Sequence, residues 1–184
     1  MSNEALSREN IQQLAEKARK IKLVITDVDG VLTDGKVFLD QTENELKSFN
    51  IKDGLGIKLL MQQNITVAVI TGRQSQIVKR RMAELNVTEV HQNQPDKRQC
   101  FASLMEKFDL EVDDIAYLGD DLPDLPLIKQ CGLGVCVADG HWFVQQQADW
   151  VTSSRGGDGA FRELAELILG SQNLLPDILE GYQH

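Results

Sequence analysis

The feature that most constrains this chain is the alternation of short apolar runs with amphipathic segments of helical length. The apolar runs are rich in valine and isoleucine, contain few polar residues, and cover residues 21–26, 65–70, 87–91, 115–118 and 133–137. Runs of this kind are typical of strands that are buried on both faces of a sheet. The sequence therefore predicts a parallel β-sheet that is covered on both faces by helices.

The segments between these runs have the spacing of amphipathic helices. They cover residues 54–63, 75–85, 96–108 and 122–130, and a last one follows at residues 159–169. Asp53 and Ser75 stand at the start of two of them, and both residue types are favoured as helix N-caps. Strands and helices that alternate in this way predict an α/β fold with a Rossmann-like sheet.

One interval departs from the alternation and predicts a protruding β-hairpin over about residues 35–50. Its strands are expected at residues 36–39 and 45–50, with a turn-prone connection at residues 40–44. It carries more apolar residues than a solvated hairpin needs, namely Val37, Phe38, Leu39, Leu46 and Phe49. Because an isolated two-stranded hairpin is only marginally stable in water, we expect it to pack against another surface, such as a second subunit.

The chain is expected to form a single domain over residues 1–184. It contains no repeat, low-complexity tract or linker, and a chain of this length can bury a sizeable core without disulfides. The last residues, about 171–184, form a tail to which the sequence assigns no specific role.

Composition excludes several classes of partner. The chain has 19 basic and 28 acidic side chains and a formal charge of −9, which argues against a nucleic-acid partner and against docking on anionic lipid. No apolar run approaches the ~18 residues of a membrane-spanning helix, and residues 1–20 lack the apolar core of a signal peptide. The three cysteines form no C-x-x-C pair. We therefore expect a cytoplasmic protein with no membrane partner.

The residues that carry chemistry follow directly after the predicted strands. Ligands bind at the carboxyl ends of the strands in parallel sheets, and four polar segments stand there: Asp27 to Gly30, Thr71 to Arg73, Pro95 to Lys97, and Gly119 to Asp124. Any one of them alone is compatible with ordinary turn chemistry, since glycine and aspartate are favoured in turns. Four such segments at one edge of one sheet indicate a site.

The chemistry of these segments is that of phosphoryl transfer. Crowded carboxylates raise one another's pKa or require a cation, and ligands that are all oxygen favour a hard ion such as Mg²⁺. One carboxylate can act as a covalent nucleophile, and a second, two residues along, can act as an acid and base. Thr71 offers a hydroxyl group and Lys97 a positive charge to a phosphate group.

These motifs, in this order and placement, resemble the four motifs of the haloacid dehalogenase superfamily of phosphatases. The resemblance implies that Asp27 is the nucleophile and Asp29 the acid and base. It implies that Thr71 and Lys97 hold the transferred phosphoryl group. It further implies that Mg²⁺ is held by the side chains of Asp27 and Asp120 and by the backbone carbonyl of Asp29, with support from Asp121 and Asp124.

The spacing of the motifs leaves no room for a separate cap domain. Asp27 and Thr71 are 44 positions apart, and Thr71 and Lys97 are 26 positions apart. The hairpin and one helix use most of the first interval, and one helix and one strand use most of the second. A site without a cap is open to solvent, which weakens its electrostatic interactions. We therefore expect another surface to cover it.

Two longer segments narrow the resemblance further. Residues 48–58 and 155–163 resemble the 3-deoxy-D-manno-octulosonate 8-phosphate phosphatase family, whose members are capless homotetramers that act in lipopolysaccharide synthesis and associate through their hairpins. Asn93 departs from the pattern, because a glycine is expected there. Carried over by position, the substrate contacts fall on Asp29, Asn50, Ile51, Lys52, Asp53, Gly54, Lys58, Arg73, Arg81 and Lys97.

Several functions remain open from the sequence. The leading one is hydrolysis of 3-deoxy-D-manno-octulosonate 8-phosphate through an aspartyl-phosphate. The same chemistry on a nonulosonate 9-phosphate is a second, since both substrates carry a carboxylate and a terminal phosphate. A phospho-accepting receiver domain shares the clustered acids, but its acceptor follows a later strand. A catalytically idle scaffold is a further alternative. For Lys58 and Arg81, the alternative to substrate binding is that both simply lie on a solvated helix face.

Overall fold

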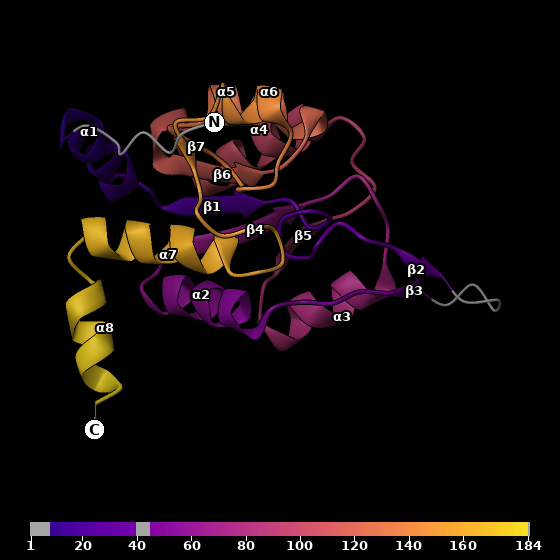
Figure 1. The fold of residues 1–184 in the computed structure, drawn as a ribbon, viewed down its shortest axis with the longest axis horizontal. Helices are drawn as coiled ribbons and strands as arrows, with labels where there is room; N and C mark the ends of the chain where they lie inside the picture. The colour runs from indigo at the N-terminus through magenta and orange to yellow at the C-terminus, as the bar shows by residue number, and fades with distance from the viewer. Residues whose placement is uncertain (1–7, 40–44, 184) are drawn as a thin grey trace.

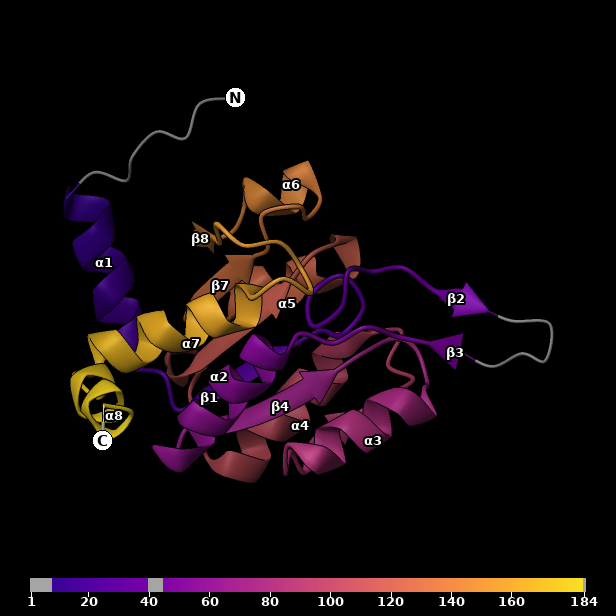
Figure 2. The ribbon, with the colours of Figure 1, turned by 60° about the horizontal axis from the view of Figure 1, so that its bottom comes forward.

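The structure is a computed structural model and describes residues 8–39 and 45–183. Within these residues, six parallel strands form one sheet in the order β5-β4-β1-β6-β7-β8 (Figures 1 and 2). Five of the strands confirm the predicted ones, within about two residues at each end. The strands span Leu23–Thr26 (β1), Thr66–Ile70 (β4), Glu89–His91 (β5), Ile115–Gly119 (β6), Leu133–Cys136 (β7) and Trp150–Val151 (β8).

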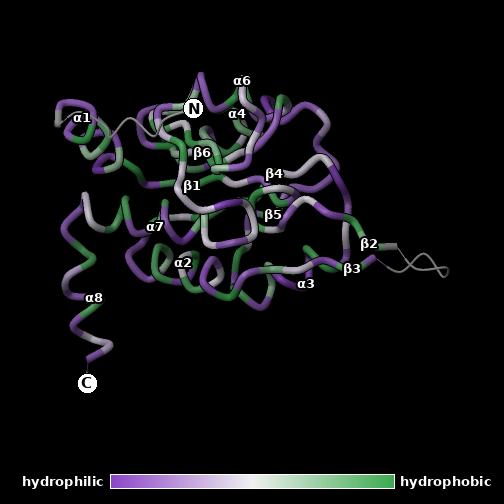
Figure 3. The backbone as a smooth tube through the Cα atoms, in the orientation of Figure 1, coloured by the Kyte–Doolittle hydropathy of each residue, from purple (hydrophilic) through white to green (hydrophobic). Residues whose placement is uncertain are grey.

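Helices cover both faces of this sheet, as the apolar strands predict. One face packs against α2, α3 and α7, with α1 beside α7, and the other packs against α4, α5 and α6 (Figures 1 and 2). Figure 3 shows hydrophobic residues along the central strands. The helices span Arg8–Arg19 (α1), Ile51–Gln62 (α2), Gln76–Glu84 (α3), Lys97–Phe108 (α4), Leu125–Gln130 (α5), Trp142–Gln145 (α6), Ala160–Ser171 (α7) and Leu175–Gly181 (α8).

The sequence of the central strand β1 does not alternate between apolar and polar residues, because both faces of the strand are buried. Val24 belongs to the hydrophobic cluster on one face of the sheet, and Leu23 and Ile25 belong to the cluster on the other. All three side chains are fully buried. A strand with helices on both sides needs an apolar residue at every position, and β1 meets this requirement.

The helix boundaries differ from the predicted ones in one informative case. The N-cap of α2 is Asn50, whose side chain accepts a hydrogen bond from the Lys52 amide at 2.9 Å. The prediction that Asp53 is this N-cap is wrong, because Asp53 lies inside the first turn and its carboxylate is used elsewhere. Ser75 is confirmed as the N-cap of α3, and its hydroxyl accepts from the Val78 amide.

The segment predicted as a protruding hairpin forms a separate two-stranded sheet. Phe38–Leu39 (β2) pairs antiparallel with Glu45–Leu46 (β3) and points away from the main sheet (Figure 2). The expected turn at residues 40–44 lies outside the described residues. We call the described residues 36–39 and 45–47 the β2–β3 arm. Phe38 and Leu46 are 54% and 63% exposed, so the apolar surface of this arm is available for a contact.

All three cysteines are buried and free. Among the described residues, no helix is both long and apolar enough to cross a bilayer.

Candidate active site

The four polar segments meet in one pocket at the carboxyl edge of the sheet. Every residue that the sequence predicts as catalytic or metal-binding lines this pocket, which has a volume of about 250 Å³. β1, β4 and β6 lie side by side and end at the same edge, and the start of α4 adds Lys97. The lining residues are Asp27, Asp29, Thr71, Gly72, Arg73, Gln94, Pro95, Lys97, Asp120, Asp121, Pro123 and Asp124.

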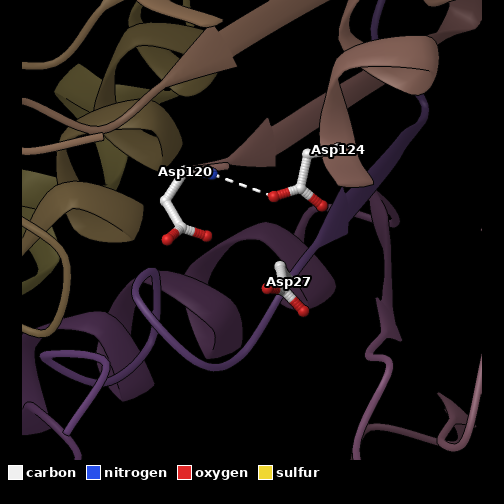
Figure 4. A group of neighbouring side chains, drawn as sticks. All are labelled: Asp27, Asp120 and Asp124. Carbon is white, nitrogen blue, oxygen red and sulfur yellow. Dashed lines mark hydrogen bonds between the residues drawn. The ribbon is translucent and has the colours of Figure 1, made fainter. Parts of the chain in front are cut away.

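Three carboxylates crowd the centre of the pocket. Asp27, Asp120 and Asp124 each place an oxygen atom within 4.8 Å of the others (Figure 4). Gly30 makes this approach possible, since a Cβ atom at its position would lie 2.1 Å from Asp120 Oδ2. Gly119 does the same on β6, where a Cβ atom would lie 2.4 Å from the Cβ of Asp124. The two glycines are therefore required by the close packing of the acids.

The crowding changes the acidity of two of these groups. Burial and the neighbouring Asp124 raise the pKa of Asp27 to about 6, against the opposing effect of Lys97. Burial, Asp124 and Asp27 raise the pKa of Asp120 to about 8. Without a cation, Asp120 therefore tends to retain its proton near neutral pH, whereas Asp27 does so only below about pH 6.

The donor set fits a hard divalent cation. Among the described residues, Asp27 Oδ1 is a buried oxygen without a hydrogen-bond partner, although the Lys97 ammonium lies 2.9 Å away outside hydrogen-bond geometry. Asp120 offers a second carboxylate within reach. Oxygen donors with one unsatisfied buried atom suit Mg²⁺, which is usually bound through one or two carboxylates.

Asp124 holds several parts of the site in place through hydrogen bonds. It is 1% exposed and accepts hydrogen bonds from Lys97 Nζ and Tyr117 Oη, both at 2.6 Å. Its other oxygen accepts from the amides of Asp120 at 3.0 Å and Asp121 at 3.3 Å. Sequence reasoning missed Tyr117, because this residue lies in an apolar run and no local pattern marks its contact with Asp124.

The remaining motif residues lie at the rim or the wall of the pocket. Asp121 is exposed and accepts a hydrogen bond from the Leu122 amide at 2.8 Å, so it caps the short 3-10 turn that follows. Thr71 is buried at the end of β4, and its hydroxyl accepts from the Arg73 amide at 3.4 Å. Thr71 thus faces the pocket from the side opposite the β6 loop.

Asp29 belongs to a second group of charges at the mouth of the pocket. Its carboxylate contacts the ammonium group of Lys47 and lies 3.8 Å from Arg73 Nε. Sequence reasoning missed Lys47, because this residue comes from the β2–β3 arm, 18 positions away from Asp29. No local motif marks such a contact.

The structure divides the predicted substrate-binding residues into two groups. Asp29, Arg73 and Lys97 line the pocket. Arg81 instead lies on α3, where its side chain approaches Gly54 of α2 and its guanidinium group is 6.0 Å from the centre of the Phe49 ring. The other predicted residues also lie outside the pocket lining of this chain, and they are Asn50, Ile51, Lys52, Asp53, Gly54 and Lys58.

The Asp53 side chain has a structural role in this chain. It is 2% exposed, and its carboxylate accepts hydrogen bonds from the Arg162 amide at 2.9 Å and the Gly159 amide at 3.3 Å. Gly159 is the N-cap of α7 and has no side chain of its own to do this. Asp53 therefore caps α7 from α2, and the prediction that its side chain contacts the substrate does not fit this placement.

We expect Asp53→Ala to lower the free energy of unfolding by about 1–2 kcal/mol, because two amides at the start of α7 lose their acceptor. Urea denaturation measures this value. Asp158→Ala is the matched control, since Asp158 is an exposed acid in the adjoining turn. A loss of kcat/KM larger than the loss of stability would indicate that Asp53 contacts the substrate instead.

Asn93 adopts the backbone conformation that the expected glycine would provide. Its φ angle is 58°, in the left-handed region that asparagine tolerates better than most residues. Its amide donates a hydrogen bond to the Arg73 carbonyl at 3.1 Å. The departure from the motif therefore preserves the turn before Lys97.

Comparison with known proteins gives this pocket a family. Residues 84–164 match a family of haloacid dehalogenase-like hydrolases. A 3-deoxy-D-manno-octulosonate 8-phosphate phosphatase from Escherichia coli K12 is 44% identical over 161 residues, which cover 88% of this chain and 86% of that protein. The chain belongs to the haloacid dehalogenase-like hydrolases. The predicted fold is thereby confirmed.

Solved structures of this family extend the comparison to bound metals. In Moraxella catarrhalis, the structure of a 3-deoxy-D-manno-octulosonate 8-phosphate phosphatase is a complex with a magnesium ion, a phosphate ion and a KDO molecule. It is 39% identical, has a TM-score of 0.91, and the match covers 93% of this chain and 98% of that one. A cobalt-bound phosphatase of the same kind from Haemophilus influenzae is 44% identical, with a TM-score of 0.83 and coverages of 85% and 92%.

Proposed function

We propose that this haloacid dehalogenase-like hydrolase is a Mg²⁺-dependent phosphatase that hydrolyses 3-deoxy-D-manno-octulosonate 8-phosphate to 3-deoxy-D-manno-octulosonate and phosphate. The observation that carries the proposal is the buried Asp27 carboxylate, 2.9 Å from the Lys97 ammonium and beside a second carboxylate, in a pocket with an Asp29 acid at its mouth. The identity to the Escherichia coli phosphatase supports the substrate. We place the reaction in lipopolysaccharide biosynthesis and in the cytoplasm.

The reaction proceeds in two steps on Asp27. Its carboxylate attacks phosphorus, the ester P–O bond breaks, and Asp29 gives a proton to the leaving sugar oxygen. Asp29 then takes a proton from a water molecule that attacks the aspartyl-phosphate. This second step releases phosphate and restores the Asp27 carboxylate. Lys97 and Thr71 lie on the pocket wall, where they neutralise and orient the phosphoryl oxygens.

The residues that would hold Mg²⁺ are the side chains of Asp27 and Asp120 and the backbone carbonyl of Asp29. A bound divalent cation supplies charge neutralisation for phosphoryl transfer and orients the phosphate group. Asp121 and Asp124 support this set from the β6 loop. Asp124 acts chiefly through its hydrogen bonds to Lys97 and to the amides of the loop.

The charges near the pocket suit a doubly anionic substrate. The chain carries a net charge of −9, but Arg73 lines the pocket with its side chain 50% exposed, and Lys97 lies at its base. A substrate meets the local field of the cleft rather than the total charge. A phosphate at Lys97 and a carboxylate near Arg73 would use both cations.

A panel of phosphomonoesters tests this function. We expect the octulosonate 8-phosphate to have the highest kcat/KM, above a nonulosonate 9-phosphate and above neutral sugar phosphates, and only with Mg²⁺ present. Released phosphate is the measured quantity. A higher kcat/KM for another ester would reassign the substrate. Phosphate release that is unaffected by chelation of divalent metals would remove the metal from the proposal.

We propose a homotetramer that is assembled through the β2–β3 arm. The arm presents Val37, Phe38 and Leu46, which are 38%, 54% and 63% exposed, and apolar groups of this size gain stability when covered. The pocket itself is open, so a neighbouring subunit would also shield it from water. In such an assembly, the exposed residues of the predicted substrate-binding set that lie outside this pocket, Ile51, Lys52 and Lys58, are available to other subunits. Asp53 and Gly54 are buried within their own chain.

Light scattering is expected to give the mass of four chains at micromolar concentration. Phe38→Glu should dissociate this assembly, because a buried charge without a partner is costly. Tyr182→Glu, at an exposed residue on the C-terminal tail, serves as the matched control for the added charge. A monomeric wild-type chain at that concentration would contradict the assembly.

Mg²⁺ affinity is expected to rise with pH between about pH 6 and pH 8. The carboxyl pKa values of Asp27 and Asp120 are raised to about 6 and about 8 in the absence of metal. Below those values both groups hold protons, which compete with Mg²⁺, and above them both are ionised. Calorimetric titration in buffers of different ionisation enthalpy measures the protons released. An affinity independent of pH, with no proton release, would contradict the prediction.

A further inference from the structure

Lys47, directly after β3, contacts Asp29, which lines the pocket. Its ammonium group contacts Asp29 Oδ1 and lies 3.3 Å from Glu45 Oε1. The Lys47 side chain has no exposed surface. Lysine side chains are almost never fully buried unless they are paired. The contact therefore differs from the mobile ion pairs of a protein surface, which hold neither partner in one geometry.

Arg73 closes these charges into a ring. Its Nη2 lies 3.2 Å from Glu45 Oε1, and its Nε lies 3.8 Å from Asp29 Oδ2. Asp29, Lys47, Glu45 and Arg73 thus alternate in sign, and we call these four residues the outer charge ring. The ring ties the arm to the loops after β1 and β4, which carry Asp29 and Arg73.

The two oxygens of Asp29 have different surroundings in this ring. Oδ1 is held by the Lys47 ammonium group. Oδ2 is 3.8 Å from Arg73 Nε, which is beyond hydrogen-bond distance. Oδ2 is therefore the oxygen that can carry a proton for exchange. A general acid must lie within hydrogen-bond reach of its target, and a misplacement of about 1 Å costs about 10²-fold in rate.

We infer that Lys47 is a positioning residue for Asp29, whose ammonium group fixes one carboxyl oxygen while the other exchanges the proton. Glu45, the first residue of β3, orients Lys47 through their ion pair. The inference rests on the proposed phosphatase function and gives the arm a role in the chemistry besides subunit contact. Lys47 keeps its own protons throughout. The proton passes from Asp29 to the leaving oxygen and returns to Asp29 from the attacking water.

The test compares Lys47→Met with the wild-type enzyme on three esters. The octulosonate 8-phosphate has a carboxylate and an alkoxide leaving group, ribose 5-phosphate has only the alkoxide leaving group, and p-nitrophenyl phosphate has a leaving group that needs little protonation. kcat/KM reports the steps up to departure of the leaving group. We expect it to fall by about 10²-fold for both sugar esters and by less than about fivefold for the aryl ester.

The matched control is Lys36→Met, since Lys36 lies on the same arm but is exposed, and among the described residues its ion-pair partner is Asp34. All three values should stay unchanged in this variant. Lys47→Arg should recover part of the loss, because it keeps the cation. If Lys47→Met does not fold, Glu45→Gln gives the same comparison, with a smaller selective loss expected.

Each other outcome overturns the inference in a defined way. A loss confined to the octulosonate ester would mean that Lys47 binds the substrate carboxylate. Equal losses on all three esters would mean a structural role, and no loss would mean that the ion pair is without effect. A wild-type enzyme that is inactive on both sugar esters would refute the proposed function itself, whatever the variants do.

Discussion

Replacing Asp27 by asparagine is expected to lower kcat by about 10⁴-fold or more. The amide has nearly the same shape as the carboxylate but lacks the charge that attacks phosphorus, so the first step is lost while the fold is kept. Asp27 is 8% exposed at the end of β1. The other carboxylate beside Lys97, that of Asp124, accepts hydrogen bonds from Lys97, Tyr117 and two backbone amides, so it is not free to attack phosphorus in its place. Phosphate release and trapping of a labelled phosphoenzyme measure the effect.

The same substitution is expected to leave the metal-free protein as stable as the wild type or more stable. Burial and Asp124 raise the pKa of Asp27 to about 6, so the folded state favours the protonated form. Above that pH the ionised carboxylate costs stability, and a neutral amide removes this cost. Lys97 keeps its hydrogen bonds to Asp124 and Tyr117. The thermal midpoint at about pH 8, measured with a chelator, should therefore not fall.

Asp34→Asn is the matched control for this variant. Asp34 belongs to the same motif but is exposed and pairs with Lys36 at 2.9 Å, away from the pocket lining. Its substitution should change kcat by less than about twofold. If Asp27→Asn kept a substantial part of the activity, the nucleophile would be another group, and the assignment of Asp27 would be wrong.

The sequence was sufficient for the central sheet because each central strand is buried on both faces. An unbroken run such as 65–70 has few alternative structures in a chain of this length. The same argument located the pocket, since the carboxyl ends of parallel strands share one edge. The two-residue strand β8 and the four-residue helix α6 are too short for their sequences to show a periodic pattern. Helix α1 was not predicted either, because its narrow apolar stripe lies within a mostly polar segment.

The contacts that the sequence could not predict are those between distant segments. Tyr117 lies in an apolar run and reads as a core residue, and only the fold brings its hydroxyl to Asp124. Lys47 contacts Asp29 only because the fold brings the chain after β3 next to the loop after β1. Asp53 has the local sequence pattern of an N-cap for α2, but Asn50 has that role in the structure. The Asp53 carboxylate instead accepts a hydrogen bond from the first turn of α7, a helix far away in the sequence.

The second large effect is expected at Asp124. Asp124→Ala should lower the free energy of unfolding by about 3–5 kcal/mol, because it leaves a buried ammonium without its closest partner. Lys97 Nζ and Tyr117 Oη each lose an acceptor at 2.6 Å, and two backbone amides of the β6 loop lose theirs. Activity should fall with it, since Lys97 and Asp120 both lose the group that holds them in place.

Urea denaturation in the presence of a metal chelator decides what Asp124 does. If it were chiefly a third metal ligand, its removal would relieve repulsion among the carboxylates, and the metal-free protein would become more stable. If Asp124 instead holds Lys97 and the β6 loop in place through its hydrogen bonds, the metal-free protein becomes less stable, as we expect. Asp121→Ala is the control in the same loop, because its exposed carboxylate caps only the following turn and should cost about 1 kcal/mol or less. The two hypotheses differ in the sign of the change, so the measurement separates them without reference to activity.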